Sequence, residues 1–233
     1  MRILALDTST QWCSVALNGD GDGEWRTGEL HAGALHSERL LPMVRALLSE
    51  AGIGLAGLDG IAFGAGPGSF TGIRVGCGVA QGLAFGTGLP LVPVSTLEAL
   101  AQEARRAHGW RRVLACLDAR MREVYAAAYA AEGAGPWRTL LEPEVAKPDE
   151  LEPVACADIH GAGNGFAAYP ALATRLGLAR VDRELRPSAR SIGELALPRL
   201  AAGRGINAAQ AMPAYVRHRI ALTTAERDAG IRL

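Results

Sequence analysis

Residues 64–82 read GAGPGSFTGIRVGCGVAQG, a stretch with seven glycines and a single charged residue, Arg74. Glycines at this density occur in loops that bind phosphate, in helices that lie close to a second backbone, and in tight turns. Apolar runs at 60–64 and 89–94 flank the stretch and predict two strands. The glycine-rich stretch therefore connects two strands, and its own pattern has to decide between the three structures.

The pattern excludes a P-loop, because that motif ends in G-K-[ST] and Lys147 is the only lysine of the chain. The GPG segment at 66–68 is predicted as a turn, and residues 70–86 are predicted as the helix that follows it. At 100° per residue the helix places five glycines within an arc of about 160°: Gly72, Gly76, Gly78, Gly82 and Gly86.

Each glycine inside a helix costs about 0.5–1 kcal/mol relative to alanine, so a second backbone must approach this face to recover the loss. The second backbone can belong to the same domain, as part of its sheet or its first helix. It can also belong to another subunit. Both arrangements are compatible with the sequence, since a helix has two sides.

The remaining elements predict an α/β fold. Apolar runs and turn residues in the first half indicate a three-strand meander, then helices alternating with strands, which together imply a mixed sheet flanked by helices. The predicted strands are 2–6, 13–17, 24–30, 60–64 and 89–94, with a hairpin loop at 19–23. The predicted helices are 36–51, 70–86 and 96–107.

A second unit begins near Trp110, which predicts two lobes, 1–107 and 108–233. Its predicted strands are 113–117, 124–130 and 157–161, and its predicted helices start near Pro170 and span 190–203. The latter helix can cross back to the first lobe. Residues 132–155 are predicted to be irregular, and 215–233 to be a charged and partly mobile tail.

Two polar turns are candidates for a nucleotide site. Asp7, Thr8 and Ser9 follow the first strand, and Gly161, Gly163 and Gly165 follow a strand of the second half. An aspartate and hydroxyls at a strand end can approach phosphates or a metal, and alternate glycines can accept phosphate. Residues 8–11 contain no glycine, however, so a structural hairpin is the favoured interpretation of the first turn. The second motif is short and also fits an ordinary turn.

The composition points to a cytoplasmic protein that does not enter membranes. The formal net charge is zero, which gives no overall attraction to nucleic acid or lipid. Residues 75–97 carry no charge, but Gly86, Pro90 and Pro93 interrupt them, and the apolar run before Asp7 is too short for a signal peptide. The four cysteines form no CxxC pair, and no two of the five histidines have a metal-binding spacing.

The ordered motifs resemble the TsaB (YeaZ) family of bacterial tRNA modification. They are RILALDTST, CSVAL, HSERLLPMV, GPGSFTGIRVG, AQGLAFG, PLVPVSTLEAL and, in the second half, LDARMREVYAAAY. The resemblance implies the two-lobed fold of actin, Hsp70 and the sugar kinases (ASKHA). It also implies a complex with a larger catalytic paralogue, TsaD, and an ATPase, TsaE. That complex makes N6-threonylcarbamoyladenosine at the adenosine next to the anticodon of tRNA.

Two departures from the paralogue imply a non-catalytic subunit. The paralogue has an acidic pair after its first hairpin and two metal-binding histidines after its Pro-Val strand. This sequence has Gln11 and Trp12 at the first place, and Thr96 and Leu100 at the second. Leucine cannot ligate a metal. We therefore expect no cofactor of its own, a degenerate nucleotide cleft, and any ATP or ADP at the interface with the paralogue.

The resemblance further implies docking through helices 36–51 and 70–86. The expected contact residues are Leu40, Met43 and Leu47 on the first helix, and Arg74, Val75 and Gly78 on the second. The inner stripe of the first helix is expected to be Leu41, Val44 and Leu48. The partners are the paralogue in a heterodimer, a second copy in a homodimer when the paralogue is absent, and tRNA only indirectly. Two alternatives remain open: an independent actin-like ATPase or kinase, and a peptidase of the glycoprotease type.

Overall fold

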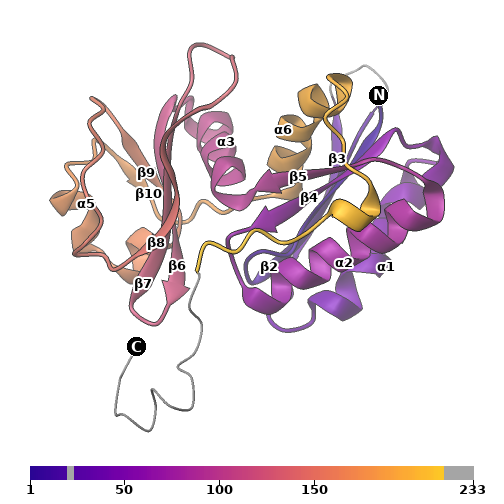
Figure 1. The fold of residues 1–233 in the computed structure, drawn as a ribbon, viewed down its shortest axis with the longest axis horizontal. Helices are drawn as coiled ribbons and strands as arrows, with labels where there is room; N and C mark the ends of the chain where they lie inside the picture. The colour runs from indigo at the N-terminus through magenta and orange to yellow at the C-terminus, as the bar shows by residue number, and fades with distance from the viewer. Residues whose placement is uncertain (20–23, 218–233) are drawn as a thin grey trace, which may run out of the picture.

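The structure is a computed structural model that describes residues 1–19 and 24–217. It has two lobes, each built on a five-stranded mixed sheet with helices against it (Figure 1). This confirms the predicted α/β fold with two mixed sheets. The predicted hairpin loop at 19–23 and the predicted tail lie largely outside the described residues.

The sheet of lobe 1 has the strand order β3-β2-β1-β4-β5. Strands β1, β2 and β3 pair antiparallel, as the meander predicted, whereas β4 and β5 join β1 in parallel. The bounds are β1 Ile3–Asp7, β2 Trp12–Asn18, β3 Trp25–His31, β4 Gly60–Gly66 and β5 Leu91–Ser95. Parallel pairing requires a crossover between strands, and α1 and α2 provide it.

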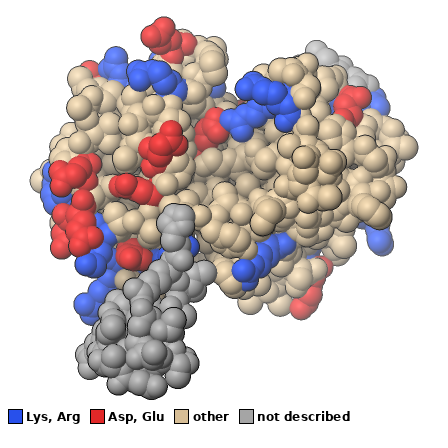
Figure 2. Space-filling view, in the orientation of Figure 1, with Lys and Arg blue, Asp and Glu red and all other residues tan. Residues whose placement is uncertain are grey.

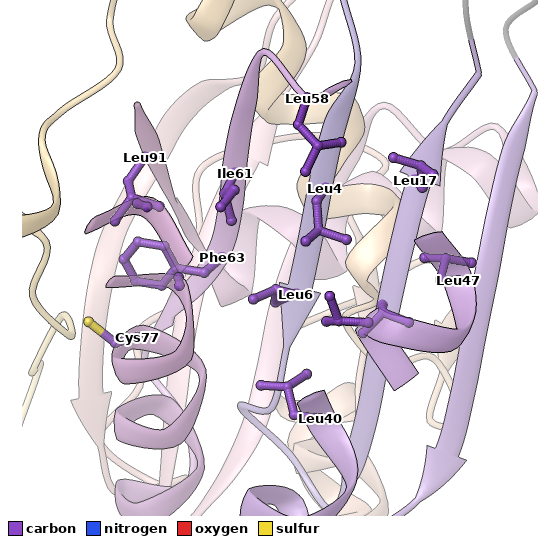
Figure 3. Packing of buried hydrophobic residues seen from close by; sticks show 14 of the residues in the cluster. Leu4, Leu6, Leu17, Leu40, Leu47, Leu58, Ile61, Phe63, Cys77 and Leu91 are labelled. Carbon is purple, nitrogen blue, oxygen red and sulfur yellow. The ribbon is translucent and has the colours of Figure 1, made fainter. Parts of the chain in front are cut away.

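Helices cover both faces of this sheet. On one face lie α1 (His36–Glu50) and α2 (Phe70–Thr87). The short turn η1 (Leu55–Gly57) connects α1 to β4. On the other face lies α6 (Ala189–Ala201), which returns from the second half of the chain. A short turn, η2 (Ala208–Gln210), then follows beside α2. Figure 3 shows the apolar layer between the sheet and the first pair of helices.

Helix α1 is rotated relative to the sequence prediction. Leu40 and Leu47 were expected on its outward side, but they are 0% and 4% exposed and point into the core (Figure 3). Leu41, expected inside, is 46% exposed. Both rotations satisfy a helical apolar spacing. The observed one packs Leu40, Val44 and Leu47 against the sheet and places a His36 ring nitrogen 3.3 Å from the Trp12 carbonyl oxygen.

The sheet of lobe 2 repeats this topology, in the order β10-β9-β6-β7-β8. The strands β6, β7 and β8 pair antiparallel, and β9 and β10 join in parallel, as in lobe 1. The bounds are β6 Arg112–Arg120, β7 Glu123–Ala130, β8 Arg138–Ala146, β9 His160–Ala162 and β10 Val181–Asp182. Helices α4 (Gly165–Ala168) and α5 (Ala171–Arg175) take the place of α2. The predicted lobe boundary at 107/108 falls at the end of α3 (Thr96–His108).

The same type of turn occurs once in each lobe. GAGPG at 64–68 ends β4, and GAGNG at 161–165 ends the equivalent strand β9. The third residue of each motif, Gly66 and Gly163, has a positive φ, +113° and +112°. Only glycine adopts this backbone readily. The repeated motif therefore builds the same turn at the same place in each lobe.

One prediction for lobe 2 is wrong. Residues 132–155 were expected to be irregular, but β8 occupies 138–146 of them. This strand lies at the edge of its sheet, and its pairing with β7 shifts register between Leu141 and Glu144, around Pro143. Edge strands and bulges tolerate proline, which has no N–H to donate. Glu142, Pro143 and Glu144 are unusual in strands, so the residue pattern did not predict β8.

Candidate functional site

A cleft of about 620 Å³ lies between the lobes, where the equivalent strand-end turns face one another. Lobe 1 contributes the turn after β1 and the turn before α2. Lobe 2 contributes the end of β6 and the start of α4. Residues 214–217, at the end of the described chain, line it as well. The predicted nucleotide residues Ser9 and Gly165 thus belong to two turns that the fold brings together.

The polar groups after β1 are used within the protein. Asp7 and Thr8 are each 1% exposed. Asp7 accepts hydrogen bonds from the Ser9 amide at 3.2 Å and from the Ser9 hydroxyl at 3.0 Å. The Thr8 hydroxyl donates to the Gly72 carbonyl oxygen at 2.7 Å. Among these three residues only Ser9 lines the cleft.

Burial also changes the acidity of this site. Removal from water raises the pKa of Asp7 to about 6, although the hydrogen bonds from Ser9 act in the opposite direction. The carboxyl group is wedged against β4, since a Cβ on Gly64 would overlap its Oδ1 atom. An ion or phosphate in the cleft would therefore not meet this side chain directly.

The glycines of the second turn pack inside lobe 2. A Cβ on Gly161 would approach Leu178 and Phe166 to 2.8 Å. A Cβ on Gly163 or Gly165 would overlap atoms of Cys116. Close contact between β9, α4 and β6 thus accounts for all three glycines, in agreement with the structural alternative left open by the sequence.

The four positions expected to differ from a catalytic paralogue lie in packed parts of the structure. The Trp12 ring lies 3.9 Å below the Arg186 guanidinium, and Gln11 Oε1 is 3.1 Å from the His31 ring nitrogen. Thr96 and Leu100 are fully buried in α3. In residues 1–19 and 24–217, no group of three or more His, Cys, Asp or Glu side chains could hold a metal ion.

The glycines of α2 divide into two sets. Gly72 and Gly76 face the turn after β1, where a Cβ on Gly72 would overlap the Thr8 carbonyl oxygen and a Cβ on Gly76 would lie 2.5 Å from the Thr8 hydroxyl. The Ser69 amide donates to the Ser9 carbonyl oxygen at 2.7 Å in the same contact. These two glycines let the start of α2 approach the chain's own backbone.

The other set faces outward. A Cβ on Gly78, Gly82 or Gly86 would meet no atom within 4 Å. Phe85 lies beside them and is 87% exposed. In Figure 2 the face of lobe 1 over α2 carries few charged side chains, whereas lobe 2 shows both signs in the same view. We call Gly78, Gly82, Phe85 and Gly86 the outward face of α2.

The expected contact residues differ in exposure. Arg74 and Gly78 are exposed, and Val75 and Met43 are half-buried. Met43 lies beside β3, because a Cβ on Gly28 would be 3.7 Å from its methyl group. Sequence reasoning missed Phe85 and Leu41. Phe85 could have been found from its spacing, because it follows Gly78 by seven residues and Gly82 by three, which is one helix face.

None of the helices within the described residues is both long and apolar enough to cross a membrane.

Comparison with known proteins identifies the family. A family model described as "TsaD: tRNA N6-adenosine threonylcarbamoyltransferase" matches residues 30–212. The "tRNA threonylcarbamoyladenosine biosynthesis protein TsaB" of Escherichia coli is 42% identical over 229 residues, which are 95% of this chain and 96% of that protein. The TsaB of Haemophilus influenzae is 40% identical and matches 94% of this chain and 95% of its own length.

A solved structure agrees with these relatives. YeaZ from Pseudomonas aeruginosa is 44% identical, superposes with a TM-score of 0.85, and covers 92% of this chain and 99% of its own. Together with the repeated sheet topology, this likeness confirms the predicted two-lobed fold of the actin, Hsp70 and sugar-kinase type. The chain belongs to the TsaB (YeaZ) family, within the wider group that the threonylcarbamoyltransferase model describes.

Proposed function

We propose that this protein is a non-catalytic subunit of the complex that makes N6-threonylcarbamoyladenosine in tRNA, and that it activates a TsaD-like catalytic paralogue by docking onto it. The same surface pairs two copies into a homodimer when the paralogue is absent. A TsaE-like ATPase completes the complex in the cytoplasm, and tRNA meets this subunit only indirectly.

The outward face of α2 is the observation that carries the proposal. Three of its four residues are glycines at which an added Cβ would meet no atom of another element within 4 Å, and the fourth is an exposed phenylalanine. Helix-interior glycines destabilise an isolated helix. Among the described residues, no atom approaches these three glycines to recover that loss. A helix from a partner can approach such a face closely and bury Phe85 in the contact.

Exposed residues of both helices would extend this surface. Leu41 replaces Leu40 and Leu47 as the outward leucine of α1, because the latter two are buried in the core. Met43, Arg74 and Val75 stay in the proposal as rim residues. An exposed aromatic side chain, a methionine and an arginine are residue types that are enriched at protein interfaces.

The burial of residues that a nucleotide or metal site would use supports a subunit without its own catalytic site. Asp7 and Thr8 are buried and hydrogen-bonded within lobe 1, which argues against an independent ATPase. Thr96 and Leu100 are fully buried residues of α3, so a substrate in the solvent cannot contact them. In this proposal any ATP or ADP binds at the interface with the paralogue.

The proposal is tested by placing a large side chain on the outward face. Gly78→Leu is expected to reduce copurification with the catalytic paralogue at least tenfold, because a leucine prevents close approach of two helices. Threonylcarbamoyladenosine formation by the reconstituted complex should fall with it. Light scattering after size-exclusion chromatography should show less homodimer.

Gly54→Leu is the matched control. Gly54 is also exposed, a Cβ on it would meet no atom within 4 Å, and it lies outside α2. It should bind the paralogue like the wild type. Wild-type binding by Gly78→Leu would reject this docking surface, and modification of tRNA by the paralogue without this subunit would reject the role in activation.

A further inference from the structure

The segment after α6 takes a path that the proposed docking does not explain. Ile206 bonds the edge strand β5 at Leu91 in both directions, at 2.8 Å each. The chain then passes along the side of α2, where the Gln81 side-chain amide donates to the Ala211 carbonyl oxygen at 2.9 Å. It finally crosses toward the β6–β7 hairpin of lobe 2 (Figure 1). We call residues 211–217 the strap.

Lobe 1 holds the strap through main-chain and aromatic contacts. The Ala214 amide donates to the Ala65 carbonyl oxygen at 2.7 Å, in the turn that ends β4. Close approach is possible because Gly66 has no side chain, since a Cβ there would lie 2.8 Å from the Ala214 carbonyl oxygen. Arg74 Nε donates to the Tyr215 hydroxyl at 2.8 Å, with its guanidinium 3.3 Å from the centre of the Phe70 ring.

Lobe 2 holds the other end through Arg217. Its guanidinium donates to the Ala119 carbonyl oxygen at 3.1 Å and forms an ion pair with Glu123. The two side chains are 16% and 29% exposed, so water screens this pair less than a surface pair. The hairpin that receives Arg217 is itself unusual, because three successive non-glycine residues, 120–122, have positive φ. Such strained backbone persists only where surrounding contacts hold it.

We propose that the strap ties the two lobes together and sets the width of the cleft, with Ala214 and Arg217 as its two attachments. In the view of Figure 1, α3 joins the lobes in the upper part of the molecule and the strap crosses below it. Lobes joined at one place hinge about it, and a second attachment limits that motion. The strap also lines the cleft with residues 214–217, so its position decides what can enter.

The test measures the distance between the lobes in the full-length protein. Spin labels are placed on cysteines that replace Thr71 in α2 and Thr174 in α5, both of which are exposed. The background carries Cys156→Ser, because Cys156 is the cysteine that is not buried. Arg217→Ala is expected to lengthen and broaden the distance distribution. Hydrogen exchange of the Ala214 amide should become about tenfold faster.

Two further sets of variants test whether loss of the Arg217 ion pair causes the change in distance. Glu123→Ala should reproduce part of the effect, because it removes the ion pair but leaves the bond from Arg217 to the Ala119 carbonyl oxygen. The double variant should add little to Arg217→Ala, because both lack the same ion pair. Lys147→Ala breaks an ion pair with Glu150 that lies within lobe 2, where both side chains are 59% exposed, and should leave the distribution unchanged. An unchanged or shorter distance in Arg217→Ala would overturn the proposal and leave α3 and α6 as the connection that fixes the cleft.

Discussion

At the scale of single residues, Asp7 makes stability depend on pH. Its pKa is about 6 in the folded protein against an ordinary value of 3.8, because burial disfavours the charged form. Below about pH 4 the carboxyl is protonated in both states, and its contribution to stability is fully present. Between about pH 4 and pH 6 only the unfolded state ionises, so the free energy of unfolding falls. Above pH 6 the folded state ionises as well, and the contribution of Asp7 is lost.

Asp7→Asn should remove this dependence. Asparagine keeps an oxygen for the Ser9 amide but carries no charge, so the variant should be more stable than the wild type by about 1–3 kcal/mol at pH 8. The two should converge near pH 4. Urea unfolding across this range measures the difference, with the exposed Asp149→Asn as the control for net charge. Equal stability at pH 8 would mean that Asp7 is not the group responsible.

At the scale of an element, α2 combines two kinds of glycine, which alanine substitution should separate. Gly72→Ala should destabilise the protein by about 1–3 kcal/mol, because the new methyl group overlaps the Thr8 carbonyl oxygen. Gly82→Ala should stabilise it by about 0.5–1 kcal/mol, since the methyl group meets no atom and alanine favours the helix.

Urea unfolding at several protein concentrations tests this pair, because Gly82 belongs to the proposed docking face and self-association would add a concentration-dependent contribution. Destabilisation by both substitutions at the lowest concentration would contradict the division of α2 into inward and outward glycines. The division explains how one glycine-rich helix can pack against its own sheet and still present a bare face.

At the scale of the whole molecule, a polar seam between α3 and α6 connects the parts of the fold. Glu98 pairs with Arg199 at 2.5 and 2.7 Å, and Gln102 donates to Glu194 at 2.8 Å. Glu103 is 3% exposed and accepts hydrogen bonds from the hydroxyls of Ser188 and Ser191. Helix α3 packs against lobe 2 and α6 against lobe 1, so this seam helps to fix one lobe to the other.

Glu103→Ala should therefore lower the free energy of unfolding by about 2–3 kcal/mol, because it leaves the fully buried Ser191 hydroxyl without its acceptor. Glu150→Ala, which breaks an exposed ion pair, should change it by less than about 0.5 kcal/mol. Thermal and urea unfolding compare the two variants. Equal effects would show that the seam contributes no more than a surface pair.

Local pattern was sufficient for most of the fold. Apolar runs, helical spacing and turn residues predicted the meander, α1, α2 and α3 close to their observed bounds. Local pattern did not predict two strands of lobe 2. Strand β8 contains Pro143 in a bulge, and β10 is two residues long. Both strands exist because a neighbouring strand supplies their hydrogen bonds, which local residue pattern does not report.

The sequence by itself determined most of the elements, the glycine turns that end β4 and β9, and the family, because each depends on residues that are neighbours in the chain. Tertiary structure alone decided which side of each helix is exposed. It buried Leu40, exposed Leu41, and divided the glycines of α2 between Thr8 and open surface. Helical spacing leaves the rotation of a helix free within a turn, and only packing against the sheet and the turn after β1 fixes it.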